Sequence, residues 1–201
     1  MDQLQTAFRR LRRWSADAAA GGRGMPSSSA EEIAAYLQEV LTLFPYTEEA
    51  RRWLSTEIAF EVVDLSSTRG GGFWIPDQNK VQLFTAQYEA AIHELAHAWW
   101  HTRRIGQEDA MIDATIALSM ETDPRYARTA QLAFGYIHGI PEQHWDGMLV
   151  DRNDWEMYAG LASGMMADVR LVPPYVRVFY DGMFAQLPDT APSSAAAAPH
   201  G

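Results

Sequence analysis

Apolar residues recur at helical spacing at the start of the chain, ahead of a segment rich in glycine and serine. Leu4, Phe8, Leu11 and Trp14 follow one another at intervals of three or four, which predicts an amphipathic helix over residues 1–20. Residues 21–29 are expected to form a flexible linker. The helix either packs on the rest of the protein or lies across its cleft as a pro-segment, and the sequence leaves both open.

Two more helices are predicted before the pattern changes. Ser29 with Glu32 three positions later is typical of a capping box, which opens a helix to about Leu43. Thr47, followed by two glutamates, is expected to cap a helix that runs to about Ile58. The apolar period then falls from 3.6 to 2, which indicates short strands. They are expected at 60–65, 73–76 and 80–84.

The helical period returns at Gln87 and persists almost to the end of the chain. Helices are expected at 87–104, 107–121, 124–138, 154–168 and 174–185. The tail 188–201, rich in Ala, Pro and Ser, is expected to be disordered. The sequence therefore predicts an α+β fold, in which a small antiparallel sheet precedes a mostly helical half, within one domain over residues 30–187.

Composition narrows the classes of function. The 201 residues carry a formal charge of −10, which argues against nucleic acid or an anionic membrane as the main partner. The absence of cysteine excludes disulfide scaffolds, Cys-ligated metal and thiol nucleophiles. No apolar run approaches the length of about 20 residues that spans a bilayer, and no signal peptide is visible. We expect a cytoplasmic protein. Export by a route that needs no signal peptide stays open.

One short motif carries specific chemistry. Two imidazoles at positions i and i+4 lie on one face of a helix and can converge on a single ion, with a glutamate placed beside it as general base. That spacing occurs within the helix predicted over 87–104, in the run His93-Glu94-Leu95-Ala96-His97. Tyr88, Ile92, Leu95 and Trp99 fall on the opposite face and are expected to anchor this helix in the core. The motif predicts a zinc site held by His93 and His97, with Glu94 as the base.

A hydrolytic zinc site needs a third protein ligand and an open position. The tight metzincin pattern requires Gly where Trp100 stands and His where Arg103 stands, so it does not supply the third ligand. His101 is expected either at the rim of the cleft or close to the ligands without contact to the ion. The best candidate is Glu156, because small residues share its side of the predicted helix 154–168 and would let that helix approach closely. Asn153 or Asp154 is expected to cap that helix. Asp113 and Glu121 stay open as alternative ligands.

With these two motifs the chain resembles the gluzincin clan of zinc peptidases, and most closely the protease-domain family of anthrax lethal factor. The likeness covers roughly 72–168, including Glu156-Met157-Tyr158-Ala159. It implies a zincin-like fold with His93, His97 and Glu156 as ligands and Glu94 as catalytic base. The family has an acidic residue where Gly160 stands, and a transition-state Tyr where Leu149 stands. An oxyanion donor would then come from elsewhere, with Tyr136, His138 and His144 as candidates.

The expected function is therefore zinc-dependent hydrolysis of peptide bonds in a peptide or protein substrate. An extended peptide could pair with the edge of the strand 80–84 or of the strand 73–76. The competing interpretation is a non-proteolytic zinc-binding regulator, or a pseudo-peptidase that serves as an interaction protein on the same fold. The intact Glu94 weighs against it, since a structural zinc site needs no base and prefers a fourth protein ligand.

Overall fold

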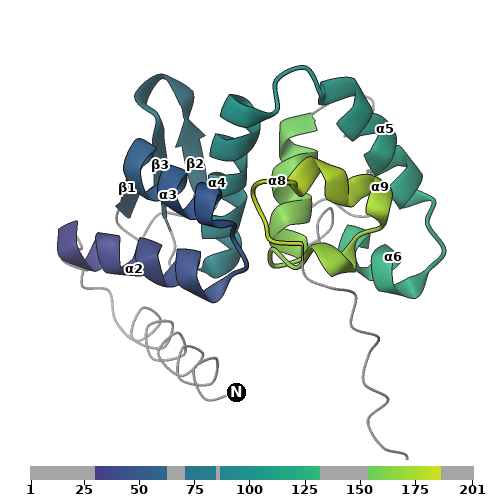
Figure 1. Ribbon diagram of the computed structural model, residues 1–201, viewed down its shortest axis with the longest axis horizontal. Coiled ribbons are helices and arrows are strands. Elements are labelled where there is room, and N and C mark those ends of the chain that lie inside the picture. The colour runs from purple at the N-terminus through teal and green to yellow at the C-terminus, as the bar shows by residue number, and fades with distance from the viewer. Residues whose placement is uncertain (1–29, 63–70, 85–86, 132–153, 187–201) are drawn as a thin grey trace, which may run out of the picture.

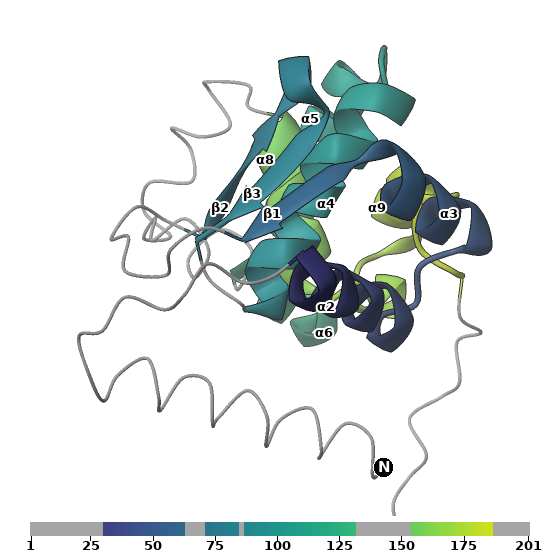
Figure 2. The same cartoon turned by 90° about the vertical axis from the view of Figure 1, so that its left-hand side faces the viewer.

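A computed structural model describes residues 30–62, 71–84, 87–131 and 154–186. Figures 1 and 2 show a small sheet with two helices on one side of the long helix α4 (Tyr88–Arg103), and further helices on its other side. The fold is mixed α+β and mostly helical, as predicted. The helix over 1–20, the linker, the tail 188–201 and the predicted Ser29 cap lie outside the described residues.

The first two described helices begin close to their predicted positions. Helix α2 spans Ala30–Leu43 and α3 spans Glu48–Glu57. The side chain of Thr47 accepts a hydrogen bond from the backbone N–H of Ala50 at 3.0 Å, which confirms it as the cap of α3. The Thr47 hydroxyl also donates to the carbonyl of Gly182, so this cap ties the N-terminal half to the C-terminal segment.

The sheet has three strands in the order β1-β3-β2, and this order differs from the prediction. Strands β1 (Ala59–Val62), β2 (Gly72–Ile75) and β3 (Lys80–Leu83) lie at the expected places. However, β1 pairs with β3 in parallel and β2 pairs with β3 antiparallel, so the expected antiparallel sheet is wrong and the sheet is mixed. Hydrophobic alternation specifies which face of a strand is buried but not which strand is its neighbour. The central strand is β3, whose Val81 and Leu83 are fully buried.

Helix α4 passes through the middle of the protein, and α8 (Asp154–Gly164) packs along it (Figure 1). Every residue of α4 from Ala91 to Trp100 is buried, which confirms Ile92, Leu95 and Trp99 as anchors in the core, while Tyr88 is half-buried. In α8 the small residues Ala159, Gly160 and Ser163 are buried, as expected for a helix that approaches its neighbour closely.

Three more helices lie in the described part of the C-terminal half. They are α5 (Glu108–Ser119), α6, described over Pro124–Gln131, and the short α9 (Pro174–Arg177). The predicted helices 154–168 and 174–185 are too long. Helix α8 ends at Gly164 and is followed by Met166 and Ala167, which have positive φ. Helix α9 is preceded by a 3-10 turn at Val169–Leu171 and followed by another at Val178–Tyr180. Local helix propensity favoured the extension of α8 through Met165 to Ala167, and the positive φ of Met166 and Ala167 ends the helix there.

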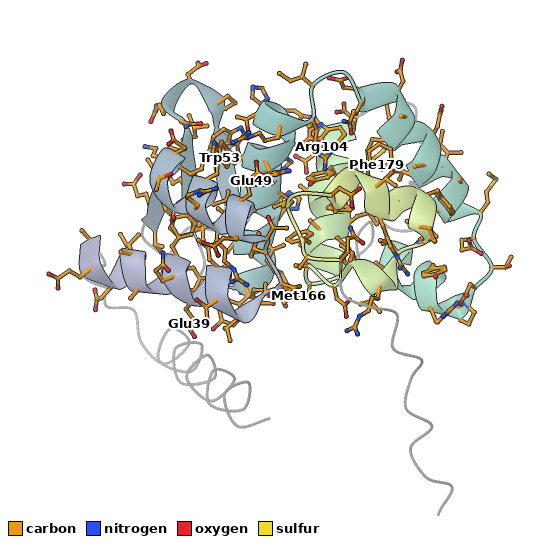
Figure 3. All side chains as sticks on the ribbon, viewed as in Figure 1. Glu39, Glu49, Trp53, Arg104, Met166 and Phe179 are labelled. Atoms are coloured by element: carbon orange, nitrogen blue, oxygen red, sulfur yellow. The ribbon has the colours of Figure 1, made fainter. Side chains whose placement is uncertain are left out.

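Side chains fill the space between the two halves (Figure 3). Trp53 of α3 meets Trp99 of α4 edge to face at 5.7 Å between centroids, and the guanidinium of Arg103 lies 5.3 Å from the Trp53 ring. At the end of α4, Arg104 donates a hydrogen bond to the carbonyl of Asp181. Among the described residues, no helix is long and apolar enough to cross a membrane.

Candidate metal centre

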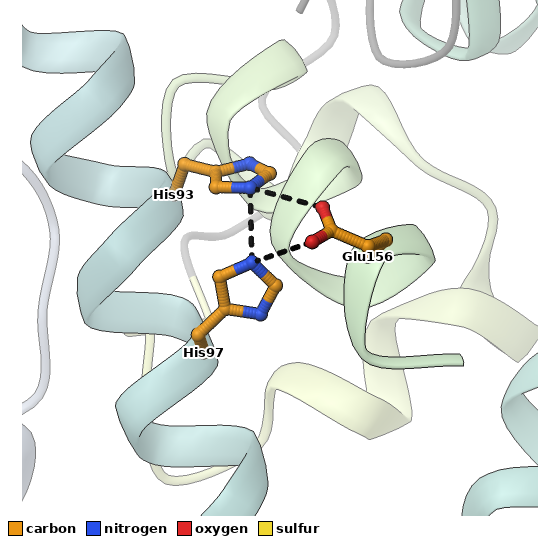
Figure 4. Close-up of side chains that lie close together, drawn as sticks. All are labelled: His93, His97 and Glu156. Atoms are coloured by element: carbon orange, nitrogen blue, oxygen red, sulfur yellow. Dashed lines mark hydrogen bonds and ion pairs between the residues drawn. The ribbon is translucent and has the colours of Figure 1, made fainter. Parts of the chain in front are cut away.

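The two histidines of α4 project from one face of the helix, as their spacing predicts. Their Nε2 atoms lie 3.0 Å apart, and the two rings meet nearly at right angles with centroids 4.5 Å apart (Figure 4). Both side chains are buried, His93 to 7% exposure and His97 to 5%. Because the surrounding helix is packed on both sides, these rings have little freedom to turn away from each other.

Helix α8 brings the third group. Glu156 places one carboxylate oxygen 3.2 Å from His93 Nε2 and the other 3.4 Å from His97 Nε2 (Figure 4). Asp154, two residues earlier, is the first residue of the helix rather than its cap, and its carboxylate accepts a hydrogen bond from the indole of Trp100 at 2.7 Å. Glu156 therefore reaches the histidines from a helix that is tied to α4 beside the site.

The spacing of these atoms fits a small divalent ion. Two ligands at about 2.0–2.1 Å from a tetrahedral ion are about 3.3 Å apart. The two Nε2 atoms lie 3.0 Å apart, their nearest oxygens of Glu156 lie 3.2 and 3.4 Å away and are the two different oxygens of the carboxylate, and one ligand atom from each residue lies within 4.8 Å of the others. Two imidazole nitrogens and a carboxylate oxygen are also a donor set that such ions accept. Among the described residues, His93, His97 and Glu156 form a group that could hold a metal ion.

The electrostatics of Glu156 favour its charged form. Burial opposes ionisation, but hydrogen bonds from His93 and His97, together with their charge, outweigh it and hold the pKa of Glu156 well below its usual range. An ionised carboxylate is the form that binds a metal. The Nδ1 atom of His97 is buried and has no hydrogen-bond partner within the described parts of the chain.

Glu94 is held from the side of the sheet. Its carboxylate accepts a hydrogen bond from the backbone N–H of Trp74 in β2. A Cβ on Gly72 would lie 2.9 Å from Glu94 Cγ and 2.8 Å from the carbonyl oxygen of Gln82, so only glycine fits this close approach. The pKa of Glu94 is raised to about 7, mainly by burial. The charge of His93 and the Trp74 N–H lower this pKa, and the charge of Glu156 raises it. A carboxylate with such a pKa is suited to proton transfer near neutrality.

An open cleft of about 400 Å³ gives access to these groups. One wall is β2 with the preceding Gly71, and the opposite wall carries Trp155 and Glu156 of α8. Trp155 is 45% exposed and meets the His97 ring at 5.8 Å, while Phe73 is 53% exposed. Ala90 also lines the cleft. The histidines are therefore reached from solvent through a passage with apolar and acidic walls.

The structure separates the other candidate residues. Asp113 is exposed on α5, and Glu121 accepts hydrogen bonds from the backbone of Thr122 and Asp123, so neither joins the group around the histidines. His101 is exposed and does not line the cleft, so its predicted place at the rim is wrong. The oxyanion-donor candidates Tyr136, His138 and His144 lie outside the described residues, and so does Leu149.

Several residues that shape the site were missed in the sequence. Gly72 was given no role at the site, although a glycine beside a strand is a signal of close backbone approach. Trp100 follows His97 by three positions and so continues the histidine face of α4, which the spacing alone could have indicated. Nothing in the sequence indicates that the Trp74 N–H meets Glu94, because that contact depends on how the sheet sits over the helix.

Comparisons of this chain with models of protein families, with curated proteins and with solved structures found no match. The resemblance to gluzincins therefore depends on the two short motifs alone.

Proposed function

We propose that this protein is a zinc-dependent metallopeptidase with a zincin-like active site. The observation that carries the proposal is the convergence of two buried imidazoles and a carboxylate from separate helices, at spacings of 3.0 to 3.4 Å, on the floor of an open cleft. Three protein ligands with solvent access are typical of catalytic rather than structural zinc sites.

Zinc is the metal that best suits the ligands, since it binds imidazole and carboxylate in tetrahedral geometry and needs no redox partner. His93, His97 and Glu156 would hold it. When bound, zinc lowers the pKa of a coordinated water and polarises the scissile carbonyl. The ionised Glu156 offsets part of the positive charge at the centre.

Glu94 is placed to act as general base. It lies between the histidine face of α4 and the sheet, with its carboxylate fixed by the Trp74 N–H and its stem held under Gly72. In the proposed reaction it accepts a proton from the attacking water and later donates one to the leaving amine. A pKa of about 7 allows both transfers at neutral pH.

The edge of β2 is a suitable surface for an extended peptide. Phe84 donates a hydrogen bond to the carbonyl of Gly71, and in this register Phe73 and Ile75 also bond to β3, so the backbone groups of Gly72 and Trp74 point to the outer edge. The Trp74 N–H is already donated to Glu94, so the Gly72 groups and the Trp74 carbonyl are the ones that a peptide would meet. No described strand pairs with that edge. The alternative edge, on the strand 80–84, is excluded because β3 is paired on both sides.

The proposal is tested by metal content and cleavage together. Protein stripped with a chelator and reloaded with zinc is expected to bind one equivalent and to cleave casein or a peptide library only when loaded. A protein that binds one equivalent of zinc and cleaves nothing would instead support the non-proteolytic regulator. The cleft that leads to the triad favours the peptidase, because a regulator has no need of solvent access to a base.

A further inference from the structure

The face of α4 that carries the histidines continues for one more turn, to Trp100. The positions 93, 97 and 100 follow the i, i+4, i+7 spacing of a single helix face. Trp100 is 4% exposed, and its indole Nε1 donates a hydrogen bond to Asp154 Oδ2 at 2.7 Å. The same face of α4 therefore presents two imidazoles and one indole to α8.

Trp100 contacts α8 on both sides of the Glu156 position. Its hydrogen bond reaches Asp154, two residues before Glu156, and its ring stacks on Tyr158, two residues after it, with centroids 4.6 Å apart. Tyr158 is fully buried and stacks in turn on Tyr180 at 4.4 Å. A rotation or slide of α8 would break one of these two contacts, and the same movement would carry Glu156 away from the histidines.

We propose that Trp100 is a positioning residue for the metal ligand Glu156. Through its hydrogen bond to Asp154 and its stacking on Tyr158, Trp100 sets where α8 holds the carboxylate, and so raises the affinity for the ion without touching it. This inference rests on the proposed metal site. Residues that only support a ligand typically change metal affinity by about 10- to 100-fold when replaced, because ligands must be held to within about 0.5 Å.

Two substitutions separate the hydrogen bond from the packing. Trp100→Phe keeps an aromatic ring against Tyr158 and removes the indole donor. Asp154→Ala removes the acceptor, while Asp154→Asn keeps an oxygen that can accept the same bond. We expect Trp100→Phe and Asp154→Ala each to weaken zinc binding by about 10- to 100-fold, and Asp154→Asn to bind close to the wild type. The double variant Trp100→Phe/Asp154→Ala should bind no more weakly than the weaker single variant, because both remove one bond.

Trp99→Phe is the matched control. Trp99 lies next to Trp100 on α4, is 3% exposed, and its indole nitrogen has no hydrogen-bond partner among the described residues. It packs against Trp53 on the side away from α8. This variant removes the same indole from the same helix, so its zinc affinity should match that of the wild type.

The measurement is competition for zinc between the purified full chain and a chelator of known affinity. The visible spectrum of the cobalt-substituted protein serves as a second readout, since it reports ligand geometry rather than activity. Thermal unfolding of the metal-free variants shows whether each is folded. If Trp100→Phe does not fold, the comparison of Asp154→Ala with Asp154→Asn decides the question.

The outcomes distinguish the two proposals. A wild type that binds no divalent ion would overturn the metal site and this inference with it. A wild type that binds zinc, with Trp100→Phe and Asp154→Ala binding equally well, would contradict the positioning role and leave the metal site standing. Equal losses in Trp99→Phe and Trp100→Phe would show that general packing of α4 sets the affinity, which also contradicts the role of this hydrogen bond.

Discussion

The two ends of the interface between α4 and α8 are built from opposite chemistry. At one end, the Nε2 atoms of His93 and His97 lie 3.0 Å apart, and each lies 3.2 or 3.4 Å from one carboxylate oxygen of Glu156. At the other end, Trp100, Tyr158 and Tyr180 stack with centroids 4.6 and 4.4 Å apart. The same two helices thus hold a polar cluster and an aromatic stack side by side.

The difference shows how the protein keeps a polar cluster inside its fold. Polar atoms with lone pairs that face one another away from water are unfavourable unless a proton or a cation lies between them. Aromatic rings, by contrast, favour contact by both burial and ring geometry. Contact at the aromatic end therefore stabilises the packing of α4 against α8. This packing fixes the distance between the two helices at the polar end, where His93, His97 and Glu156 could hold an ion.

The largest effect is expected from Glu94→Gln, which changes the polar end without touching its metal ligands. The amide cannot accept a proton, so kcat/KM for peptide cleavage should fall by about 10²- to 10⁴-fold. Zinc binding should be unchanged, because Glu94 is not part of the ligand group. Steady-state kinetics with elemental analysis check both points, and retained cleavage in the zinc-loaded variant would contradict the role of Glu94.

Phe184→Ala removes a ring that packs on Tyr180 of the aromatic end and leaves the polar end unchanged. Phe184 is 1% exposed and lies 5.7 Å from the Tyr180 ring and 5.0 Å from the Tyr46 ring. Removing a buried aromatic side chain lowers the free energy of unfolding by about 3–5 kcal/mol. Denaturant unfolding of the metal-free protein measures this loss. The affinity of the folded variant for zinc should not change, because the hydrogen bond between Trp100 and Asp154 stays in place. A large loss of affinity would show that Phe184 and Tyr180 also position Glu156.

Glu156→Gln tests the third ligand directly. The substitution keeps the size of the side chain and removes its charge, so zinc affinity should fall by more than about 100-fold, beyond the range of residues that only support a ligand. Asp113→Asn is the control, because Asp113 is an exposed carboxylate on α5 and was the rival candidate. Competition with a chelator checks both, and the reverse order of affinities would assign the ligand to Asp113.

The smallest effect is expected from Gly72→Ala on the sheet side of the site. The added Cβ would lie 2.9 Å from Glu94 Cγ and so displace the base. A displacement of about 1 Å in a catalytic group reduces the rate by up to about 100-fold, and we expect between 10- and 100-fold here. The zinc affinity should stay the same. Loss of zinc binding in this variant would mean that β2 supports the histidines and not only the base.

The sequence predicted the histidine face of α4 well and the pairing of the strands poorly. His93, Glu94 and His97 lie within four residues of one helix, so their relation follows from helical geometry alone. The strands β1, β2 and β3 were located correctly, but their order and mixed direction were not, because pairing is a choice between distant segments. The ends of α8 and α9 were also misplaced: good helix formers follow α8, at Met165 to Ala167, and the chain after α9 continues in a 3-10 turn.

The sequence predicted Glu156 only in part. The small residues of its helix indicated a close approach to another helix, and the structure confirms that approach by bringing Glu156 to the histidines. The sequence alone could not exclude Asp113 or Glu121, because every carboxylate on a later helix satisfies the same pattern.

The sequence by itself determined the chemistry of the site: two imidazoles one turn apart, a base beside them and a carboxylate on a helix with a small-residue face. Tertiary structure alone decided which carboxylate meets the histidines, which strand edge faces the cleft, and which backbone N–H holds Glu94. The physical reason is the separation along the chain between the residues that meet. Helical spacing fixes neighbours within a turn, whereas contacts between α4, α8 and β2 depend on packing of the whole core.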